Sequence, residues 1–285
     1  MDLVTVTCTR DFEQMILQAH SIDVFLTRPC RHWVFVEDQT TELDTWRQAL
    51  SPWYKKHKLE LLPGRHYDIP GINTGWDRQQ LIKMEAAKFV RTNTYLVLDS
   101  KNFFVKPTNL YNWPVSEGNN LIYDIKRDQP FIPWLTAFCE DYKLSFSSAA
   151  CEPVTPFRLD TDTVLKLLDL DVSKIFSNPL DGISEFVLYS IYTQSQGRQL
   201  PEGPTANVTI YDQKILLSDH AAVFEDMYSW PLVCQLGLHR KSLENLPGYP
   251  QVFCQWLASK GLELSVINDV MQRWQSGPMQ GTANP

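Results

Sequence analysis

The sequence lacks the short motifs that mark several large enzyme classes. Its 285 residues include only 12 Gly, and no G-x-S-x-G, no P-loop and no G-x-G-x-x-G occurs. These motifs build the nucleophile elbow, the phosphate cradle and the dinucleotide-binding turn. Their absence argues against a serine hydrolase, a P-loop NTPase and a dinucleotide-dependent oxidoreductase.

Cysteine is sparse and scattered along the chain. No two cysteines form a C-x-x-C pair, so the sequence indicates neither a zinc site nor a disulfide framework. We expect buried thiols at Cys8, Cys30, Cys139, Cys151, Cys234 and Cys254.

The sequence also lacks an excess of positive charge and any long apolar run. The net charge is -7 and there is no extended run of Lys or Arg, which argues against nucleic acid as the main partner. A local cationic pocket for a phosphate ligand remains compatible with this charge. No apolar run approaches the roughly 20 residues that span a bilayer, which leaves only peripheral membrane contact open. The first residues enter a strand pattern without a charged-then-apolar leader, so we expect no secretory signal and a cytoplasmic protein.

The most informative segment that is present is TYLVLDSKNFFVKP, residues 94–107. Tyr95 to Leu98 predict a strand buried on both faces, which is typical of sheets covered by helices. The strand ends in Asp99. In open α/β sheets ligands bind beyond the carboxyl ends of the strands, so Asp99 is a candidate ligand-binding carboxylate. The alternative is that Asp99 only caps the following turn.

Strands alternate with helices over the first hundred residues, a pattern typical of a Rossmann-like, mostly parallel sheet covered by helices. Right-handed crossovers would bring the strand ends to one edge of the sheet. The expected strands are 3–7, 32–37, 58–62 and 94–98, and the expected helices are 12–25 and 76–90. The expected strand ends carry Thr9 and Arg10, Glu37 and Asp38, Arg65 and His66, and Asp99 to Asn102.

The second half of the chain is less regular. Asp160 and Thr161 precede a capped amphipathic helix, and the segment Asp181 to Ser184 precedes another that runs from Glu185 to Gln196. Residues 250–274 suggest two closing helices. We predict one domain over residues 1–275, with a ligand-binding half at 1–110 and an irregular half at 111–275. The small polar tail 276–285 is predicted to be disordered.

Asp99 and Lys101 lie two residues apart and share one face if the strand continues. Sugar-nucleotide transferases often carry Asp-x-Asp here to hold a divalent cation against the donor diphosphate. Lys101 replaces the second acid, so metal ligation through Asp99 is doubtful, but its ammonium group can itself neutralise diphosphate oxygens. The equally weighted alternative is a partly exposed ion pair between Lys101 and Asp99.

Five other polar residues could contribute to a site. Gln79 and Lys83 share a helix face from which they could reach ribose or phosphate, although a solvated face is the commoner outcome. Glu185, in the first turn of a helix, could deprotonate an acceptor hydroxyl or serve only the helix dipole. His239 and Arg240 follow an apolar run. A lone His is more often structural, whereas Arg can bind a phosphate with two hydrogen bonds.

Taken together, four segments resemble an uncharacterised bacterial family of glycosyltransferase-like proteins with the GT-A fold, associated with surface polysaccharide synthesis. The likeness runs from Leu3 to about Arg240, and the ordered set is more specific than any one motif. The segments are VTVTCTRDFEQMILQAHSID, GWDRQQLIKMEAA, YLVLDSKNFFVKP and SEFVLYSIY.

The resemblance implies a glycosyltransferase that moves a sugar from a nucleotide-diphosphate donor to a glycan or lipid-linked acceptor. It implies that Asp99 and Glu185 are catalytic and that Mn²⁺ or Mg²⁺ is a possible cofactor, in doubt because of Lys101. The implied donor-binding residues are Thr9, Arg10, Glu37, Asp38, Gln79, Lys83, Lys101, Asn102, His239 and Arg240.

Two other functions remain open at this point. A chain that lost turnover with its second acid would be a non-catalytic nucleotide-sugar or glycan-binding protein. A nucleotidyltransferase would need a glycine-rich loop after the first strand, and residues 7–13 contain no glycine. The second alternative is therefore the weaker one.

Overall fold

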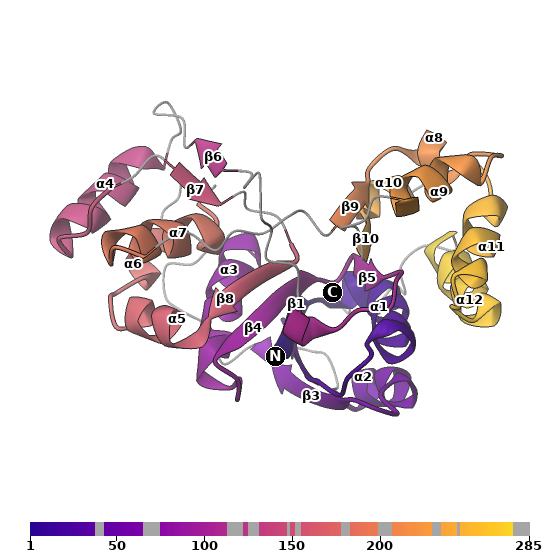
Figure 1. Ribbon diagram of the computed structural model, residues 1–285, viewed down its shortest axis with the longest axis horizontal. Helices are drawn as coiled ribbons and strands as arrows, with labels where there is room; N and C mark the ends of the chain where they lie inside the picture. Colours follow the sequence, from indigo (N-terminus) through magenta and orange to yellow (C-terminus); the bar gives the residue numbers. More distant parts are fainter. Residues whose placement is uncertain are drawn as a thin grey trace, which may run out of the picture.

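The fold is built around a five-stranded sheet, seen in the computed structural model of Figure 1. The structure describes residues 1–37, 43–64, 75–112, 122–124, 131–146, 149–151, 155–177, 183–198, 207–229, 235–243 and 246–275. The strands of the sheet, in spatial order, are β3 (Lys58–Pro63), β2 (Arg31–Val36), β1 (Asp2–Thr7), β4 (Thr94–Asp99) and β8 (Phe157–Asp160).

The first four strands of this order are parallel, and β8 is antiparallel to β4. Strand order runs outward from β1 to β3 on one side and jumps to β4 on the other. Such a reversal leaves a crevice beyond the carboxyl ends of the two central strands, the usual ligand position in open α/β sheets. In the register of β1 and β4, Val6 pairs with Asp99, so both strands end at the same level. The predicted helix-covered, mostly parallel α/β fold is confirmed.

Helices cover both faces of the sheet (Figure 1). The core on one face contains residues of α1 (Phe12–Phe25), α2 (Leu43–Leu50), α11 (Gln251–Ser259) and α12 (Leu264–Gln275), with α12 packed on α1 and α11 packed on α12. The core on the other face contains residues of α3 (Gly75–Glu85), α4 (Ile132–Asp141), α5 (Thr161–Leu168), α6 (Ser173–Phe176) and α7 (Glu185–Ser195), with α4 packed on α6.

The central strand β4 shows why the sequence forms this fold. Tyr95, Leu96, Val97 and Leu98 are all completely buried. Leu96 and Leu98 join the core on the α1 face, whereas Tyr95 and Val97 join the core on the α3 face. Burying each such side chain contributes about 1.5–3 kcal/mol. At its carboxyl end the strand leaves this apolar cover at Asp99, whose side chain is 29% exposed.

Two smaller sheets were not predicted from the sequence. One has the order β5 (Asn102–Phe104), β10 (Gln235–Leu238), β9 (Asn207–Ile210), and the other pairs β6 (Ile122–Asp124) with β7 (Ala149–Cys151). Because β10 is antiparallel to β5, the amide of Leu238 donates to the carbonyl of Lys101 at 3.0 Å. This pairing carries a segment from late in the chain to the turn after β4.

Short elements complete the described chain. The remaining helices are α8 (Gln213–Leu216), α9 (Ala222–Ser229) and α10 (Arg240–Leu243), with the 3-10 turns η1 (Thr9–Asp11), η2 (Ser51–Trp53), η4 (Ala86–Lys88) and η5 (Leu110–Asn112).

The predicted helix starts are confirmed by their caps. The side chain of Asp160 accepts a hydrogen bond from the amide of Thr163 at 2.9 Å, and Ser184 Oγ accepts one from the amide of Phe186 at 3.2 Å. The helix expected over 76–90 is shorter, because α3 ends at Glu85 and continues as η4. The tail predicted to be disordered, 276–285, lies outside the described residues.

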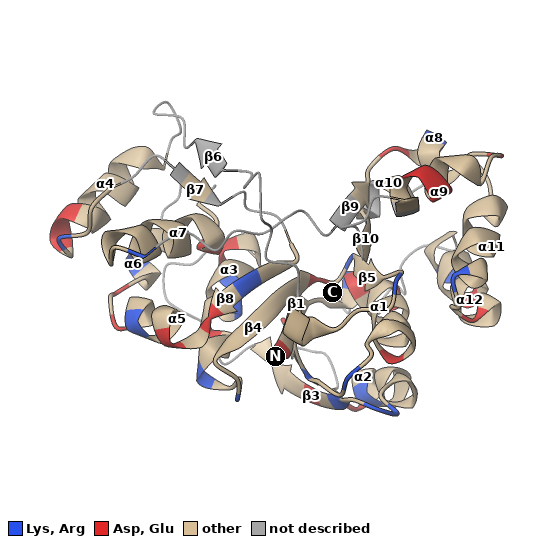
Figure 2. Cartoon of the chain, in the orientation of Figure 1, with Lys and Arg blue, Asp and Glu red and all other residues tan. Residues whose placement is uncertain are grey.

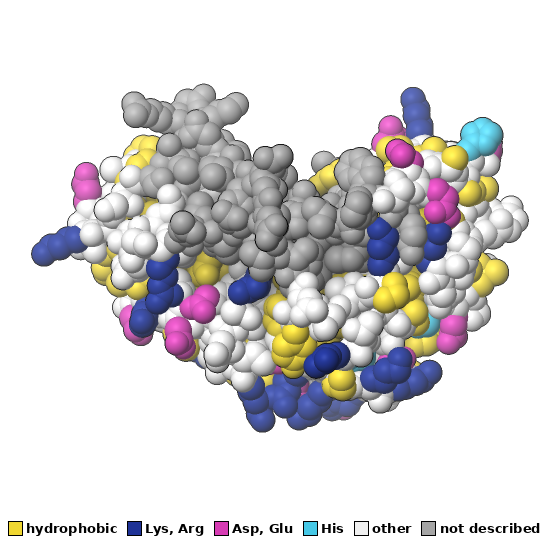
Figure 3. Space-filling view, in the orientation of Figure 1, with side chains coloured by type: hydrophobic (Ala, Val, Ile, Leu, Met, Phe, Trp, Pro, Cys, Tyr) yellow, Lys and Arg dark blue, Asp and Glu magenta, His cyan; other side chains and the backbone are white. Residues whose placement is uncertain are grey.

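Charges of both signs are interspersed along the described chain (Figure 2). On the face seen in Figure 3, Lys and Arg side chains gather along the edge below β3 and α2, away from the carboxyl end of β4. Among the described helices, none combines the length and apolar character that a bilayer span requires.

Candidate functional site

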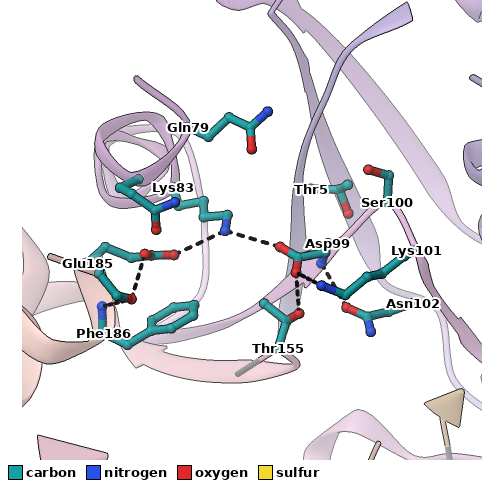
Figure 4. Close-up of polar contacts among 12 residues, drawn as sticks. Thr5, Gln79, Lys83, Asp99, Ser100, Lys101, Asn102, Thr155, Glu185 and Phe186 are labelled. Atoms are coloured by element: carbon teal, nitrogen blue, oxygen red, sulfur yellow. Dashed lines mark hydrogen bonds and ion pairs between the residues drawn. The ribbon is translucent and has the colours of Figure 1, made fainter. Parts of the chain in front are cut away.

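A row of four alternating charges crosses the carboxyl end of β4, from α7 through α3 to the turn after the strand (Figure 4). Lys83 Nζ lies 3.2 Å from Glu185 Oε1 and 3.1 Å from Asp99 Oδ1. Lys101 Nζ lies 2.8 Å from Asp99 Oδ2. Thr155 Oγ1 donates to the same Asp99 oxygen at 2.8 Å. Because two acids alternate with two bases, the row is neutral when all four are ionised.

Exposure rises along this row. The side chain of Glu185 is fully buried and that of Lys83 is 7% exposed, whereas those of Asp99 and Lys101 are 29% and 25% exposed. The Lys83 ammonium group also lies 5.6 Å from the ring centroid of Phe186. A ligand in solvent can therefore reach the Asp99 and Lys101 end, while the Glu185 and Lys83 end supports it from the core.

The charges shift one another's protonation. Burial alone would raise the pKa of Asp99, but the ammonium groups of Lys83 and Lys101 outweigh it and hold that pKa well below its usual range. Burial would lower the pKa of Lys83, yet Asp99 and Glu185 raise it above the ordinary lysine value. Glu185 has a raised pKa because burial and the nearby Asp99 outweigh Lys83. Asp99 and Lys83 are thus held charged, while Glu185 is the member most ready to accept a proton.

The turn after β4 is closed by a side chain other than Asp99. Asn102 Oδ1 accepts a hydrogen bond from the amide of Asp99 at 2.9 Å, and Ser100 Oγ donates to Asp11 Oδ2 at 2.8 Å. The chain turns at Ser100 and Lys101 and resumes as β5 at Asn102, so the strand does not extend through these residues. Asn102 is fully buried and its predicted contact with a donor stays a prediction.

A second polar cluster holds the end of β2. Glu37, only 8% exposed, accepts a hydrogen bond from Arg78 Nε on Oε1 and from Gln79 Nε2 on Oε2, both at 2.9 Å. Gly64 lies against the backbone of Glu37, so that a Cβ at position 64 would be 2.8 Å from the Glu37 Cα. The start of α3 is thus tied to the strand ends through Glu37.

The other predicted donor-side residues surround the same edge. Thr9 and Arg10 follow β1 in η1 and are exposed. The hydrogen bond from Ser100 to Asp11 links η1 to the turn after β4. His239 follows β10 directly, and its ring packs on Tyr211 with centroids 4.7 Å apart.

Two predicted residues are not placed in full. Arg240 begins α10, but its side chain is not among those described. Asp38 lies outside the described residues.

The residues at Asp99 do not fit a divalent cation. Both carboxylate oxygens accept hydrogen bonds, one from Lys83 and the other from Lys101 and Thr155. A metal ion would have to displace these donors and sit beside two ammonium groups. Within the described ranges, no group of three His, Cys, Asp or Glu side chains could hold a metal ion.

Three contributors were missed in the sequence. Thr155 comes from a segment far along the chain, and nothing near it signals a contact with Asp99. Arg78 stands beside the predicted Gln79, and its contact with Glu37 could have been sought from that position. Gln18 of α1 donates hydrogen bonds to the carbonyl oxygens of Asp99 and Asn102. The signal for it is a helix with many buried polar residues, which indicates internal hydrogen bonding.

Comparison with known proteins gives one family and several structures. Residues 5–231 match a family described as a family of unknown function, DUF6492. The curated proteins give no match.

Among solved structures, the WbbM bifunctional glycosyltransferase in its apo form is 10% identical with a TM-score of 0.51. The match covers 94% of this chain and 51% of that one. The chain therefore spans about half the length of WbbM.

Two further structures match with lower scores. The galactosyltransferase LgtC, in complex with donor and acceptor sugar analogs, is 11% identical with a TM-score of 0.49, covering 91% of this chain and 96% of that one. GlyE from Streptococcus pneumoniae TIGR4 is 13% identical with a TM-score of 0.47, covering 96% and 63%. At these identities the likeness concerns the fold alone. It rests on WbbM, whose TM-score of 0.51 is the highest of the three.

Proposed function

We propose that this chain, which belongs to the DUF6492 family, is a glycosyltransferase that uses a nucleotide-diphospho-sugar donor. The observation that carries the proposal is the row of charges ending in Asp99 and Lys101, at the point where strand order reverses. The glycosyltransferase-like fold supports it. We place the reaction in the cytoplasm, with a glycan or lipid-linked acceptor of polysaccharide synthesis.

Lys101 is the group proposed to stabilise the leaving diphosphate. Departure of a nucleoside diphosphate needs positive charge near the β-phosphate, supplied by a side chain or a metal. Lys101 Nζ is tied to Asp99 but keeps further protons to donate, and its side chain is a quarter exposed. Arg10 and His239 lie at the same edge and are proposed to assist with the phosphates. Asp99 orients Lys101 and faces the donor sugar.

Glu37, Gln79 and Thr9 are proposed to line the nucleotide side. Glu37 is already held by Arg78 and Gln79, so its carboxylate is fixed before a ligand arrives. A pre-positioned acceptor of hydrogen bonds suits a ribose hydroxyl or a base amide.

Glu185 is proposed to act through Lys83. Its carboxylate is fully buried and meets the Lys83 ammonium group and the Ser184 hydroxyl. Proton abstraction from an acceptor hydroxyl would require this carboxylate to become accessible. We therefore assign Glu185 the narrower role of holding Lys83, and through it Asp99, in a fixed charge state.

A second candidate is a non-catalytic nucleotide-sugar or glycan-binding protein. The hydrogen bonds of Asp99 favour this binding protein, because three donors already use both carboxylate oxygens. This candidate predicts binding of nucleotide diphosphates without turnover of any sugar donor.

Thermal-shift titration with UDP, GDP, ADP, CDP and dTDP, each with EDTA and with Mn²⁺, tests the proposal. We expect at least one nucleotide to raise the melting temperature in EDTA. If none does under either condition, the donor site is wrong. Release of nucleoside diphosphate from sugar donors then separates the enzyme from the binding protein.

A further inference from the structure

A chain of buried side chains ends at the turn that presents Asp99 and Lys101. Gln18 of α1 is fully buried, and its Nε2 donates to the carbonyl oxygens of both Asp99 and Asn102, each at 2.8 Å. These two carbonyls flank the turn. One amide group thus holds both sides of the loop that carries Lys101.

The two hydrogen bonds that Gln18 donates determine the hydrogen-bond directions of Thr5 and His32. Because Nε2 faces two carbonyls, Oε1 must face Thr5 Oγ1, 3.0 Å away, and the Thr5 hydroxyl must donate to it. That hydroxyl has a single proton, so its contact of 2.9 Å with His32 Nε2 requires His32 to donate. His32 Nδ1 then carries no proton and accepts from the Tyr54 hydroxyl at 2.6 Å.

This arrangement requires an uncharged His32 imidazole, and the buried environment of His32 keeps the ring uncharged. His32 is fully buried, and burial first, then the nearby His57, lowers its pKa to about 3. Burial likewise raises the pKa of Tyr54 well above its usual value, so its hydroxyl keeps its proton. All the hydrogen bonds from Tyr54 to the turn therefore point in one direction.

We propose that Gln18, Thr5 and His32 are positioning residues for Asp99 and Lys101, acting as one directed hydrogen-bond relay from Tyr54 to the turn. The relay crosses β2, β1 and α1 before it reaches the turn. Its fixed polarity prevents the Gln18 amide from rotating, because the opposite orientation would set its oxygen against two carbonyls. The consequence for donor binding rests on the proposed function, whereas the relay itself does not.

A pair of nearly isosteric changes at Thr5 tests the relay. Thr5→Val keeps the volume and removes the hydroxyl, whereas Thr5→Ser keeps the hydroxyl. We expect Thr5→Val to weaken binding of the best nucleotide diphosphate about tenfold, with Thr5→Ser within about twofold of wild type. Gln18→Met should show the same loss as Thr5→Val, and a double variant should add little because both changes break one chain.

Nitrogen NMR of His32 gives a readout that needs no ligand. The relay predicts a neutral imidazole with the proton on Nε2, unchanged from about pH 5 to pH 8. A proton on Nδ1, or titration of His32 in this range, would overturn the relay. Equal nucleotide binding by folded Thr5→Val and Thr5→Ser would overturn the positioning role.

The two proposals fail in different ways. If wild type binds no nucleotide diphosphate, the proposed function fails, and the positioning role is judged from crystal structures of the two Thr5 variants. A displaced Asp99 to Asn102 turn in Thr5→Val alone supports it, and an unmoved turn contradicts it.

Discussion

The ammonium group of Lys83 lies 3.1 Å from Asp99 Oδ1, so a lysine on α3 neutralises the acid that ends the central strand. The side chain of Lys83 is 7% exposed, and its ammonium group also faces Glu185. A buried cation between two acids is a stability element as well as part of the site.

Lys83→Met is expected to lower the free energy of unfolding by about 3 kcal/mol at pH 7, because two acids near the core lose their shared counter-charge. Lys88→Met is the matched control. The side chain of Lys88 is 53% exposed and pairs with Glu85 three residues away on the chain, so its loss should cost less than about 1 kcal/mol. Urea unfolding of both variants measures this. Equal effects of the two changes would contradict the role given to Lys83.

Asp99→Asn and Glu185→Gln are expected to show opposite pH trends. The pKa of Asp99 is lowered by folding, so its ionisation stabilises the protein above about pH 4 and this contribution is lost as pH falls further. The cost of Asp99→Asn should therefore shrink between pH 7 and pH 3.

The pKa of Glu185 is raised by folding, so its ionisation opposes folding at neutral pH. The cost of Glu185→Gln should therefore be smaller at pH 7 than at pH 4. Urea unfolding at the three pH values measures both trends, and parallel trends would contradict the assigned charge states.

Gly64→Ala is expected to destabilise the protein by about 2 kcal/mol, because its Cβ would lie 2.8 Å from the Glu37 Cα and 3.0 Å from the Val36 carbonyl oxygen. The backbone there cannot yield without moving the end of β2. Gly248→Ala, whose nearest neighbour would be 4.0 Å away, should change stability by less than about 0.5 kcal/mol. Thermal unfolding of the pair decides. If Gly64→Ala left the stability unchanged, the backbone of Glu37 would not be held as described.

Lys101→Asp places two acids at Asp-x-Asp spacing and is expected to create a dependence on Mn²⁺ that wild type lacks. The change removes one of the donors to Asp99 and supplies a new oxygen ligand. Thermal shifts with nucleotide diphosphate, in EDTA and in Mn²⁺, measure it. A wild-type protein that itself requires Mn²⁺ for binding would contradict the role given to Lys101.

The strands and helices that could be predicted are those with strong local patterns. The expected helix over 12–25 matches α1, and four strands were placed within a residue or two, because each is an apolar run bounded by turn residues. The small sheet of β5, β10 and β9 was missed. Its pairing of β5 with β10 joins segments more than a hundred residues apart, and such pairing leaves no local pattern.

The candidate site could be proposed from the sequence where strand ends carry polar residues. Asp99 and Lys101 were selected on this basis, and the ion pair that was one of the two alternatives for Lys101 is present. Lys83 was expected more often on a solvated face and is instead buried, because two acids from different elements compensate its charge. Thr155 and Gln18 depend on tertiary contacts that one sequence does not display.

The central claim is that the Asp99 and Lys101 end of the charged row binds a nucleotide diphosphate through a side-chain cation. Calorimetric titration of the best nucleotide in EDTA, with wild type, Lys101→Gln and the control Lys88→Gln, tests it most directly. We expect metal-free binding by wild type and Lys88→Gln, and about tenfold weaker binding by Lys101→Gln. No binding by wild type, or equal affinity of all three proteins, would contradict the account.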